Sequence, residues 1–98
     1  MDLTTVTPLT LTYNEAANIG RTIDRLTWAE RVVVVDSYSE DATIEIAESY
    51  ENVDLIQHEF DHFADQCNFG LGQINTEWVL SLDADYVCST DLVDEIRG

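Results

Sequence analysis

Asp83 and Asp85 are the two residues of this sequence whose type and spacing best suit the binding of a cation. They follow the apolar segment 77–82, which predicts a strand, and residues i and i+2 of an extended chain point the same way. Two neighbouring carboxylates repel each other unless one is protonated or a cation lies between them. Their oxygen atoms suit Mg²⁺ or Mn²⁺, which completes its shell with waters and substrate phosphates. The pair Asp83 and Asp85 therefore predicts a divalent-cation site for a phosphate-bearing ligand. The alternative is a solvated acidic loop.

The charge balance of the chain makes such a cation useful. The 98 residues include 20 Asp and Glu, four arginines and no lysine, and the formal net charge is −16. A chain this acidic repels a diphosphate, and a bound metal ion reverses the local sign. The same balance excludes a nucleic-acid binder, which needs a basic face, and attraction to an anionic membrane surface. A P-loop is excluded too, because it needs a lysine.

Apolar segments of two periodicities alternate along the chain and predict one α/β domain that covers residues 1–98. The expected strands cover 6–12, 32–35, 53–56 and 77–82. Helical stripes cover 15–27, 41–50 and 63–74 (with Phe63, Cys67, Leu71 and Ile74 facing the core), and a last short helix covers 90–96. We expect Asn14 to cap the first helix, with Glu15 in its first turn, and Ser39 or Asp41 to cap the second. Four consecutive valines at 32–35 are typical of a parallel strand buried on both faces.

The polar residues that follow these strands are expected to meet at one edge of the sheet. Parallel strands with right-handed crossovers end on the same edge, and ligands of such sheets bind beyond the carboxyl ends. The groups that follow the four strands are 13–15, 36–41, 58–62 and 83–85. Asp36 has two interpretations that the pattern does not separate. It either ends its strand and caps a turn, or it accepts hydrogen bonds from a base or ribose over the sheet edge.

Four motifs, in order and at typical separations, resemble a known enzyme family. They are T-Y-N-E at 12–15, V-V-V-D-S-Y-S-E-D-A-T at 33–43, F-A-D-Q-C-N-F-G-L at 63–71 and W-V-L-S-L-D-A-D at 78–85. Together they resemble the donor half of an inverting glycosyltransferase of family two, over roughly 6–96. The branch it is most similar to adds sugars in lipopolysaccharide-core or other surface-glycan synthesis. The resemblance implies the GT-A fold: a three-layer, Rossmann-like parallel sheet of strand order 3-2-1-4 with helices on both faces.

The resemblance also implies roles for individual residues in binding a nucleotide-sugar donor. The nucleotide pocket would be lined by Thr12, Tyr13 and Glu15, with Glu15 near the ribose. Asp36 would bind the base, typically uracil of a UDP-sugar, beside a turn shaped by Ser39 and Asp41. Asp83 would face the ribose and the metal, and Asp85 would hold Mg²⁺ or Mn²⁺ on the diphosphate, where the ion stabilises the leaving group as a Lewis acid.

The sequence departs from the family pattern in two places. Cys67 stands where the family commonly has an arginine that helps to hold the nucleotide. The acceptor-binding half and the catalytic base of the family lie well beyond its D-x-D motif, so we nominate no catalytic base. We expect a donor-binding piece of a larger or shortened enzyme, which binds the donor but does not turn it over. A glycan or lipid-linked acceptor is expected for the whole enzyme, and exposed apolar surface favours self-association into a homo-oligomer.

Three other functions remain open from the residues. His58-Glu59-Phe60-Asp61-His62 matches the H-E-x-x-H of zinc metallopeptidases by letter, although the motif falls at a strand-to-helix turn and no third histidine exists. L-S-L-D-A-D-Y-V at 80–87 resembles the first motif of haloacid-dehalogenase-type phosphohydrolases, but it lies near the end of the chain and their lysine is missing. The third is a non-catalytic acidic α/β binding module.

The remaining composition bears on the environment of the chain. Cys67 and Cys88 form no CxxC pair and no disulfide framework, so we expect two small buried apolar residues. No signal peptide or membrane-spanning run is visible, and we expect a cytoplasmic protein. The acidic surface without lysine suits a high-salt, halophilic-like cytoplasm, because salt screens repulsion between like charges. This expectation requires the melting temperature to rise with KCl concentration.

Overall fold

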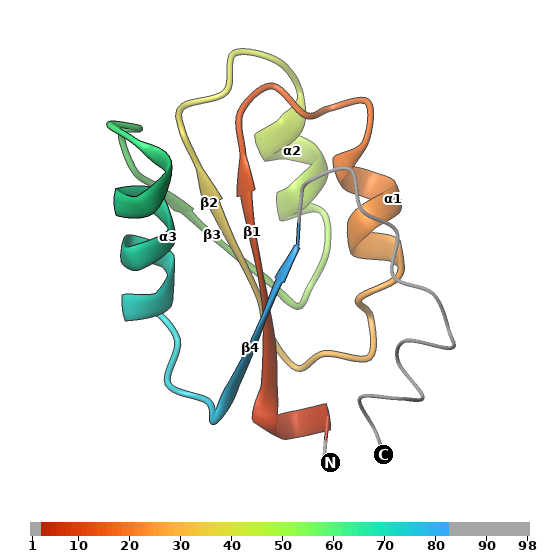
Figure 1. Cartoon of the computed structure of the whole chain (residues 1–98). Coiled ribbons are helices and arrows are strands. Elements are labelled where there is room, and N and C mark those ends of the chain that lie inside the picture. Colours follow the sequence, from red (N-terminus) through yellow and green to blue (C-terminus); the bar gives the residue numbers. More distant parts are fainter. Residues whose placement is uncertain (1–2, 83–98) are drawn as a thin grey trace.

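The computed structural model describes residues 3–82 and shows a four-stranded sheet packed between helices (Figure 1). The strands are β1 (Val6–Thr12), β2 (Val32–Asp36), β3 (Val53–Gln57) and β4 (Trp78–Leu82). The helices are a short 3-10 turn η1 (Leu3–Thr5), α1 (Ile19–Asp24), α2 (Thr43–Glu48) and α3 (Phe63–Gly72). All four strands expected from the sequence are therefore confirmed, within one residue at each end.

The sheet has the order β3-β2-β1-β4, and all its neighbouring strands are parallel. Thr12 at the end of β1 lies in register with Asp36 at the end of β2, which in turn lies opposite Gln57 at the end of β3. In β4, Leu82 is the last described residue, and it pairs with Thr10. The carboxyl ends of β1, β2 and β3 thus form one level edge, and the predicted strand order is confirmed.

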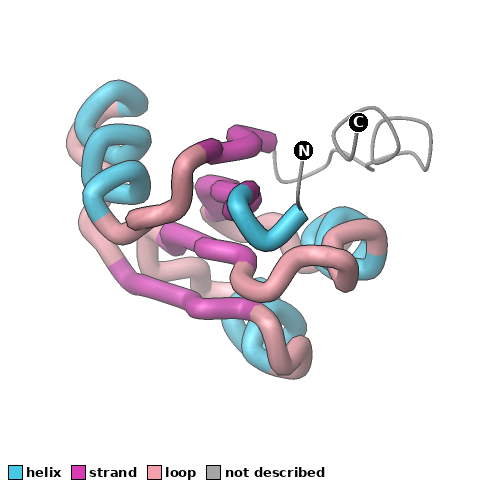
Figure 2. The backbone as a smooth tube through the Cα atoms, turned by 90° about the horizontal axis from the view of Figure 1, so that it is seen from below, coloured by secondary structure: helices cyan, strands magenta, loops and turns pink. Residues whose placement is uncertain are grey.

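Helices cover both faces of this sheet and make the three predicted layers (Figure 2). On one face, Ile19 and Ile23 of α1 pack with Ala47 of α2. On the other face, α3 brings Phe69 against the side chains of Leu9, Val33 and Val35. β2 therefore alternates between two clusters, with Val33 and Val35 in one and Val32 and Val34 in the other.

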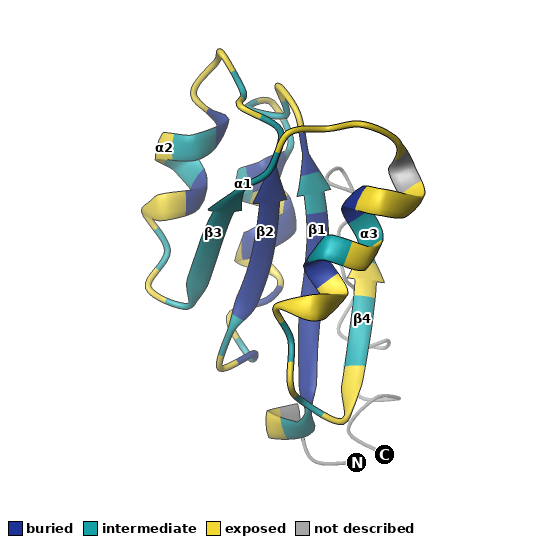
Figure 3. Ribbon diagram, turned by 90° about the vertical axis from the view of Figure 1, so that its left-hand side faces the viewer, coloured by how far each residue is buried: buried dark blue, intermediate teal, exposed yellow. Residues whose placement is uncertain are grey.

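Burial decreases from the centre of the sheet to its edges (Figure 3). All residues of β2 are buried, and so are all of β1 except Leu11. Every residue of the edge strand β3 is only half-buried. A fully buried valine contributes about 1.5–3 kcal/mol to folding, so the four valines of β2 form the centre of the core. This arrangement explains why the run 32–35 shows no alternation of apolar and polar residues.

The first two helices are shorter than expected, and their predicted caps are wrong. α1 begins at Ile19, because residues 15–18 form a turn in which Glu15 carbonyl oxygen accepts from the amides of Asn18 and Ile19. Asn14 does not cap this helix but has a left-handed backbone with φ of 52°. The residue before α2 is Ala42, whose side chain offers no capping group. Both loops use their polar side chains to bind each other instead.

The inward face of α3 also differs from the expected stripe. Leu71 is 46% exposed and Cys67 is half-buried, while Gln66 is only 1% exposed. Gly70 lies so close to β1 that an added Cβ would come within 2.8 Å of Leu9 Cδ1. α3 therefore turns Gly70 and Gln66 toward the sheet. A stripe of apolar residues at helical spacing predicts neither of them.

Some expectations lie outside the described residues. These are the helix at 90–96, Cys88, and the aspartates Asp83 and Asp85. Within residues 3–82, no helix is both long enough and apolar enough to cross a lipid bilayer.

Candidate functional site

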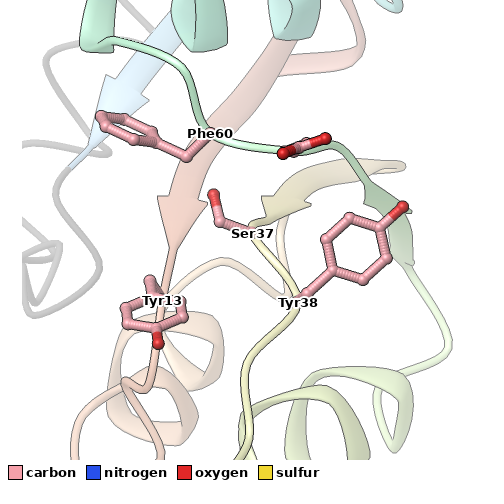
Figure 4. Close-up of a pocket in the computed structure, with 5 residues that line it drawn as sticks. Tyr13, Ser37, Tyr38 and Phe60 are labelled. Carbon is pink, nitrogen blue, oxygen red and sulfur yellow. The ribbon is translucent and has the colours of Figure 1, made fainter.

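A pocket of about 750 Å³ opens at the carboxyl ends of the first three strands (Figure 4). Three loops contribute to it: the one after β1, the one between β2 and α2, and the one between β3 and α3. The described residues that line it are Tyr13, Ser37, Tyr38, Glu59 and Phe60. The pocket therefore lies at the sheet edge where the sequence predicts a ligand.

Three aromatic side chains dominate the walls of this pocket. Tyr13, Tyr38 and Phe60 are 55%, 59% and 53% exposed, although large apolar rings are normally covered. Flat exposed rings around one cavity offer stacking surfaces for a planar ligand. None of the described lining residues is a cation, so this part of the site favours an uncharged aromatic ring over a phosphate.

Tyr38 holds its ring in the pocket from a strained backbone. Its φ is 58°, in the left-handed region that costs a bulky L-residue roughly 1–2 kcal/mol. Hydrogen bonds from two successive amides hold the chain here. The Tyr38 amide donates to Gln57 Oε1 at 3.0 Å, and the preceding Ser37 amide donates to the Thr12 carbonyl at 3.0 Å. Strain that is held in this way is typical of functional sites.

Asp36 lies beneath the pocket as a fully buried carboxylate. Its Oδ1 accepts from the Thr12 hydroxyl at 2.6 Å and from the Ser39 hydroxyl at 2.5 Å. Its Oδ2 accepts from the Ser39 amide at 2.8 Å. A buried carboxylate must be compensated by such donors. In this structure both oxygens therefore hold the β2–α2 turn and the end of β1 together.

The loops after β1 and β2 are bound to each other by a second pair of contacts. The Asn14 amide donates to Ser39 Oγ at 2.8 Å, and Asn14 Oδ1 accepts from the Glu40 amide at 2.8 Å. Asn tolerates the left-handed conformation that these contacts require. The side chain that the sequence suggested as a helix cap thus fixes the distance between two walls of the pocket.

Asp41 and Thr43 continue this junction toward the two helices. Asp41 Oδ1 accepts from the Thr43 amide at 2.9 Å and from the Thr43 hydroxyl, and its Oδ2 accepts from the Ala16 amide at 3.2 Å. The hydrogen bond from the Thr43 side chain is the main reason why the pKa of Asp41 is lowered. Thr43 Oγ1 in turn accepts from the Glu15 amide at 2.8 Å. Asp41 therefore orders the turn before α2 without being a conventional cap.

Gln66 connects α3 to the loop between β2 and α2 and to the loop between β3 and α3. Its Nε2 donates to the His58 carbonyl at 3.1 Å and to Ser37 Oγ at 2.8 Å, and its Oε1 lies 2.7 Å from His58 Nδ1. A carbonyl can only accept, so the amide nitrogen must face it. His58 Nδ1 consequently carries the proton that bonds Oε1. The imidazole also stacks on Phe69, with the ring centroids 3.8 Å apart.

The family is decided by a match over most of the chain. Residues 9–96 match the family model described as glycosyl transferase family 2. The chain belongs to this family. The predicted resemblance is thereby confirmed.

Curated relatives of this glycosyltransferase chain agree with the match. An uncharacterized glycosyltransferase of Rickettsia bellii is 38% identical over 88 residues, which are 89% of this chain and 30% of that protein. The lipopolysaccharide core biosynthesis glycosyltransferase LpsC of Rhizobium meliloti is 32% identical over 76 residues, which are 74% of this chain and 28% of LpsC. The chain thus spans less than a third of the length of these relatives.

Solved structures share the fold of this family-2 chain. The crystal structure of S. aureus TarS 1-349 in complex with UDP-GlcNAc has a TM-score of 0.81 and 27% identity, over 93% of this chain and 29% of the TarS chain. The mannosyltransferase PcManGT of Pyrobaculum calidifontis in complex with GDP-Man and Mn²⁺ has a TM-score of 0.72 and 31% identity, over 84% and 28%.

The structure places the predicted site residues of this glycosyltransferase chain in two groups. Thr12, Asp36 and Ser39 form the hydrogen-bonded cluster beneath the pocket, and Tyr13 lies in its wall. Glu15 is not among the described lining residues, and its carboxylate accepts from Asn18 Nδ2 at 3.4 Å. Asp83 and Asp85 lie outside the described residues, so their expected roles remain predictions.

Four lining residues were not predicted individually: Ser37, Tyr38, Glu59 and Phe60. The available signal was their position directly after β2 and β3, where parallel sheets bind ligands. Gln66 was missed because its side chain is polar and its helix was read by apolar spacing alone. Only the paired loops reveal that an amide is required there.

The histidines do not form the helical metal site that the letters H-E-x-x-H suggest. His58 follows β3 and bonds Gln66, whereas His62 is the residue before α3. The two are therefore not one turn apart on a helix, as that zinc motif requires. Within residues 3–82, the one group that could hold a metal ion is Asp61, His62 and Asp65, all exposed. His62 Nε2 there already lies 3.0 Å from Asp65 Oδ2.

Proposed function

We propose that the chain binds the donor of an inverting glycosyltransferase, a UDP-sugar, with the help of a divalent cation. The observation that carries this proposal is the aromatic pocket at the carboxyl ends of three parallel strands in a family-2 chain. The TarS complex with UDP-GlcNAc supports the choice of a uridine nucleotide. The base would occupy the pocket, where Tyr13, Tyr38 and Phe60 offer stacking surfaces.

The diphosphate needs a partner other than the pocket walls, which have no cation among the described residues. We assign this role to a metal ion held by Asp83 and Asp85. They directly follow β4, which pairs in parallel with β1, so their position in the sequence fits the edge of the sheet where the pocket opens. PcManGT, in complex with GDP-Man and Mn²⁺, supports metal use. When bound, such an ion supplies Lewis-acid stabilisation of the departing diphosphate.

The biological setting of the transfer is also part of the proposal. The likeness to LpsC supports sugar addition in lipopolysaccharide or another surface glycan, with a glycan or lipid-linked acceptor. Inversion is carried over from the family resemblance, and the cytoplasmic location is carried over from the sequence analysis. We nominate no base for the acceptor hydroxyl, so the proposal for this chain is donor binding.

Isothermal titration calorimetry with UDP, with and without Mn²⁺, tests the proposal. We expect UDP to bind only when Mn²⁺ is present, and we expect the Asp85→Asn variant to lose this metal-dependent binding. Asp61→Asn is the matched control, because this exposed aspartate belongs to the other acidic group and should leave binding unchanged. If UDP gave no heat of binding with or without Mn²⁺, the result would refute the donor site and would favour a non-catalytic acidic module.

A further inference from the structure

We propose that Glu59, rather than Asp36, is the carboxylate that recognises the base, acting together with the hydroxyl of Ser37. The inference rests on the proposed function, since it concerns the same pocket. It assigns a specificity-determining residue to the loop between β3 and α3. The recognised group would be a ring N–H next to a carbonyl.

Asp36 is poorly placed to take this role itself. Its side chain is fully buried, and both of its oxygens accept hydrogen bonds from Thr12 and Ser39. A base could reach it only if the turn after β2 opened and left these donors without an acceptor. Asp36 is therefore a positioning residue that fixes the loop from which Ser37 and Tyr38 project.

Glu59 is the one charged side chain among the described residues that line the pocket. It is exposed, and within residues 3–82 its carboxylate has no hydrogen-bond or ion-pair partner. A carboxylate repels a diphosphate and can only accept hydrogen bonds when it is ionised. Its presence in the pocket therefore favours an uncharged ligand group that donates a hydrogen bond, such as a ring N–H.

Ser37 supplies the complementary donor. The nitrogen of the Gln66 side chain is fixed by the His58 carbonyl, so it donates to Ser37 Oγ at 2.8 Å. The hydroxyl oxygen of Ser37 thus acts as an acceptor inside the protein, and its own hydrogen is free to donate into the pocket. Glu59 and Ser37, one acceptor and one donor, match the N–H and the adjacent carbonyl of a lactam.

Uracil has this arrangement at N3 and O4, and guanine has it at N1 and O6. The nucleotides named in the TarS and PcManGT complexes, UDP-GlcNAc and GDP-Man, carry these two bases. Stacking by Tyr13, Tyr38 and Phe60 would not distinguish a lactam from another planar ring, because every base has a flat face. Discrimination would come from Glu59 and Ser37.

The test is a binding cycle with two nucleotides and two proteins. UDP and N3-methyl-UDP, which lacks the ring N–H, are titrated into the wild-type chain and into Glu59→Ala in the presence of Mn²⁺. We expect Glu59→Ala to weaken UDP binding about tenfold, the value of a hydrogen bond to a charged group. The affinity for N3-methyl-UDP should stay the same or rise, since a carboxylate facing a methyl group gains nothing. Glu59→Gln should retain part of the UDP affinity, because its amide oxygen still accepts.

Glu51→Ala is the matched control, because Glu51 is also exposed and precedes β3 at the opposite end of the sheet. It removes the same charge and should change neither affinity. If Glu59→Ala weakened both nucleotides equally, or strengthened UDP binding, the inference would be wrong while the donor site stood. If the wild-type chain bound no UDP, the proposed function would fail and this inference with it.

Discussion

The hydroxyl of Thr12 donates to the carboxylate of Asp36 at 2.6 Å, and this bond joins the last residues of two neighbouring parallel strands. The bond is buried, and its two residues directly precede Tyr13 and Ser37, which line the aromatic pocket. The same carboxylate holds Ser39 through both its amide and its hydroxyl. One side chain therefore determines how the loops after β1 and β2 are placed relative to each other.

Replacing Asp36 tests this role. Asp36→Ala leaves three donors without an acceptor, and we expect the free energy of unfolding to fall by about 3 kcal/mol. Thr12→Val removes one of the three bonds and should cost about 1 kcal/mol. Urea denaturation measures both. Asp61→Ala, at an exposed position, is the control and should change stability by less than about 0.5 kcal/mol; a loss as small as this at Asp36 would contradict the assignment.

The left-handed backbone of Tyr38 predicts that a glycine variant at this position is more stable than an alanine variant, the reverse of the usual order. Tyr38→Ala keeps the unfavourable φ, whereas Tyr38→Gly relieves it, so the glycine variant should be more stable by about 1 kcal/mol. At Glu40, which has no left-handed backbone, the alanine variant should be the more stable one. Both Tyr38 variants should bind UDP more weakly, because the ring is lost. A glycine variant less stable than the alanine variant would show that the backbone is not strained.

Gln66 should be required for the order of the pocket loops. Gln66→Leu preserves most of the volume but removes the bonds to Ser37 and His58, and we expect a loss of about 2 kcal/mol in stability. Without Gln66 Oε1 as acceptor, the His58 imidazole should no longer be held with its proton on Nδ1, and ¹⁵N NMR of the imidazole detects this change of tautomer. Gln73→Leu, at the exposed end of the same helix, is the control. An unchanged His58 tautomer in the Gln66 variant would mean that another group holds the ring.

Tyr50 and Asp24 give a prediction about alkaline pH. The Tyr50 hydroxyl donates to Asp24 at 2.6 Å, and this bond raises the pKa of Tyr50 to about 12. Because the folded-state pKa lies above the ordinary value, the contribution to stability is complete below about pH 10 and is lost as the pH rises through 12. Tyr50→Phe should cost less than about 1 kcal/mol at pH 7, since the pair is solvent-screened. Denaturation curves of both proteins should converge toward pH 12; a constant difference would contradict the shifted pKa.

The sheet could be predicted from the sequence because its signals are local. Four valines in a row, four apolar segments at regular intervals and the absence of linkers determine a parallel order within few alternatives. The edge of the sheet where the pocket opens could be predicted by the same argument, since polar residues directly follow each expected strand.

The details of the site could not be predicted, because they depend on contacts between loops. Asn14 is as suitable for a helix cap as for its actual bond to Glu40, and only the partner loop decides between them. Gln66 interrupts an apolar stripe, so spacing alone placed Leu71 inward instead. Glu59 and Phe60 belong to a letter pattern that suggests zinc, and their place in the pocket depends on the turn that begins α3.

A crystal structure of the chain with UDP and Mn²⁺ is the most direct test of the account. We expect the uracil to lie in the pocket among Tyr13, Tyr38 and Phe60, with its N3–H toward Glu59 and the diphosphate near Asp85. A uracil bound outside this pocket, or a diphosphate far from Asp85, would contradict the central claim that these strand ends form a nucleotide-sugar site.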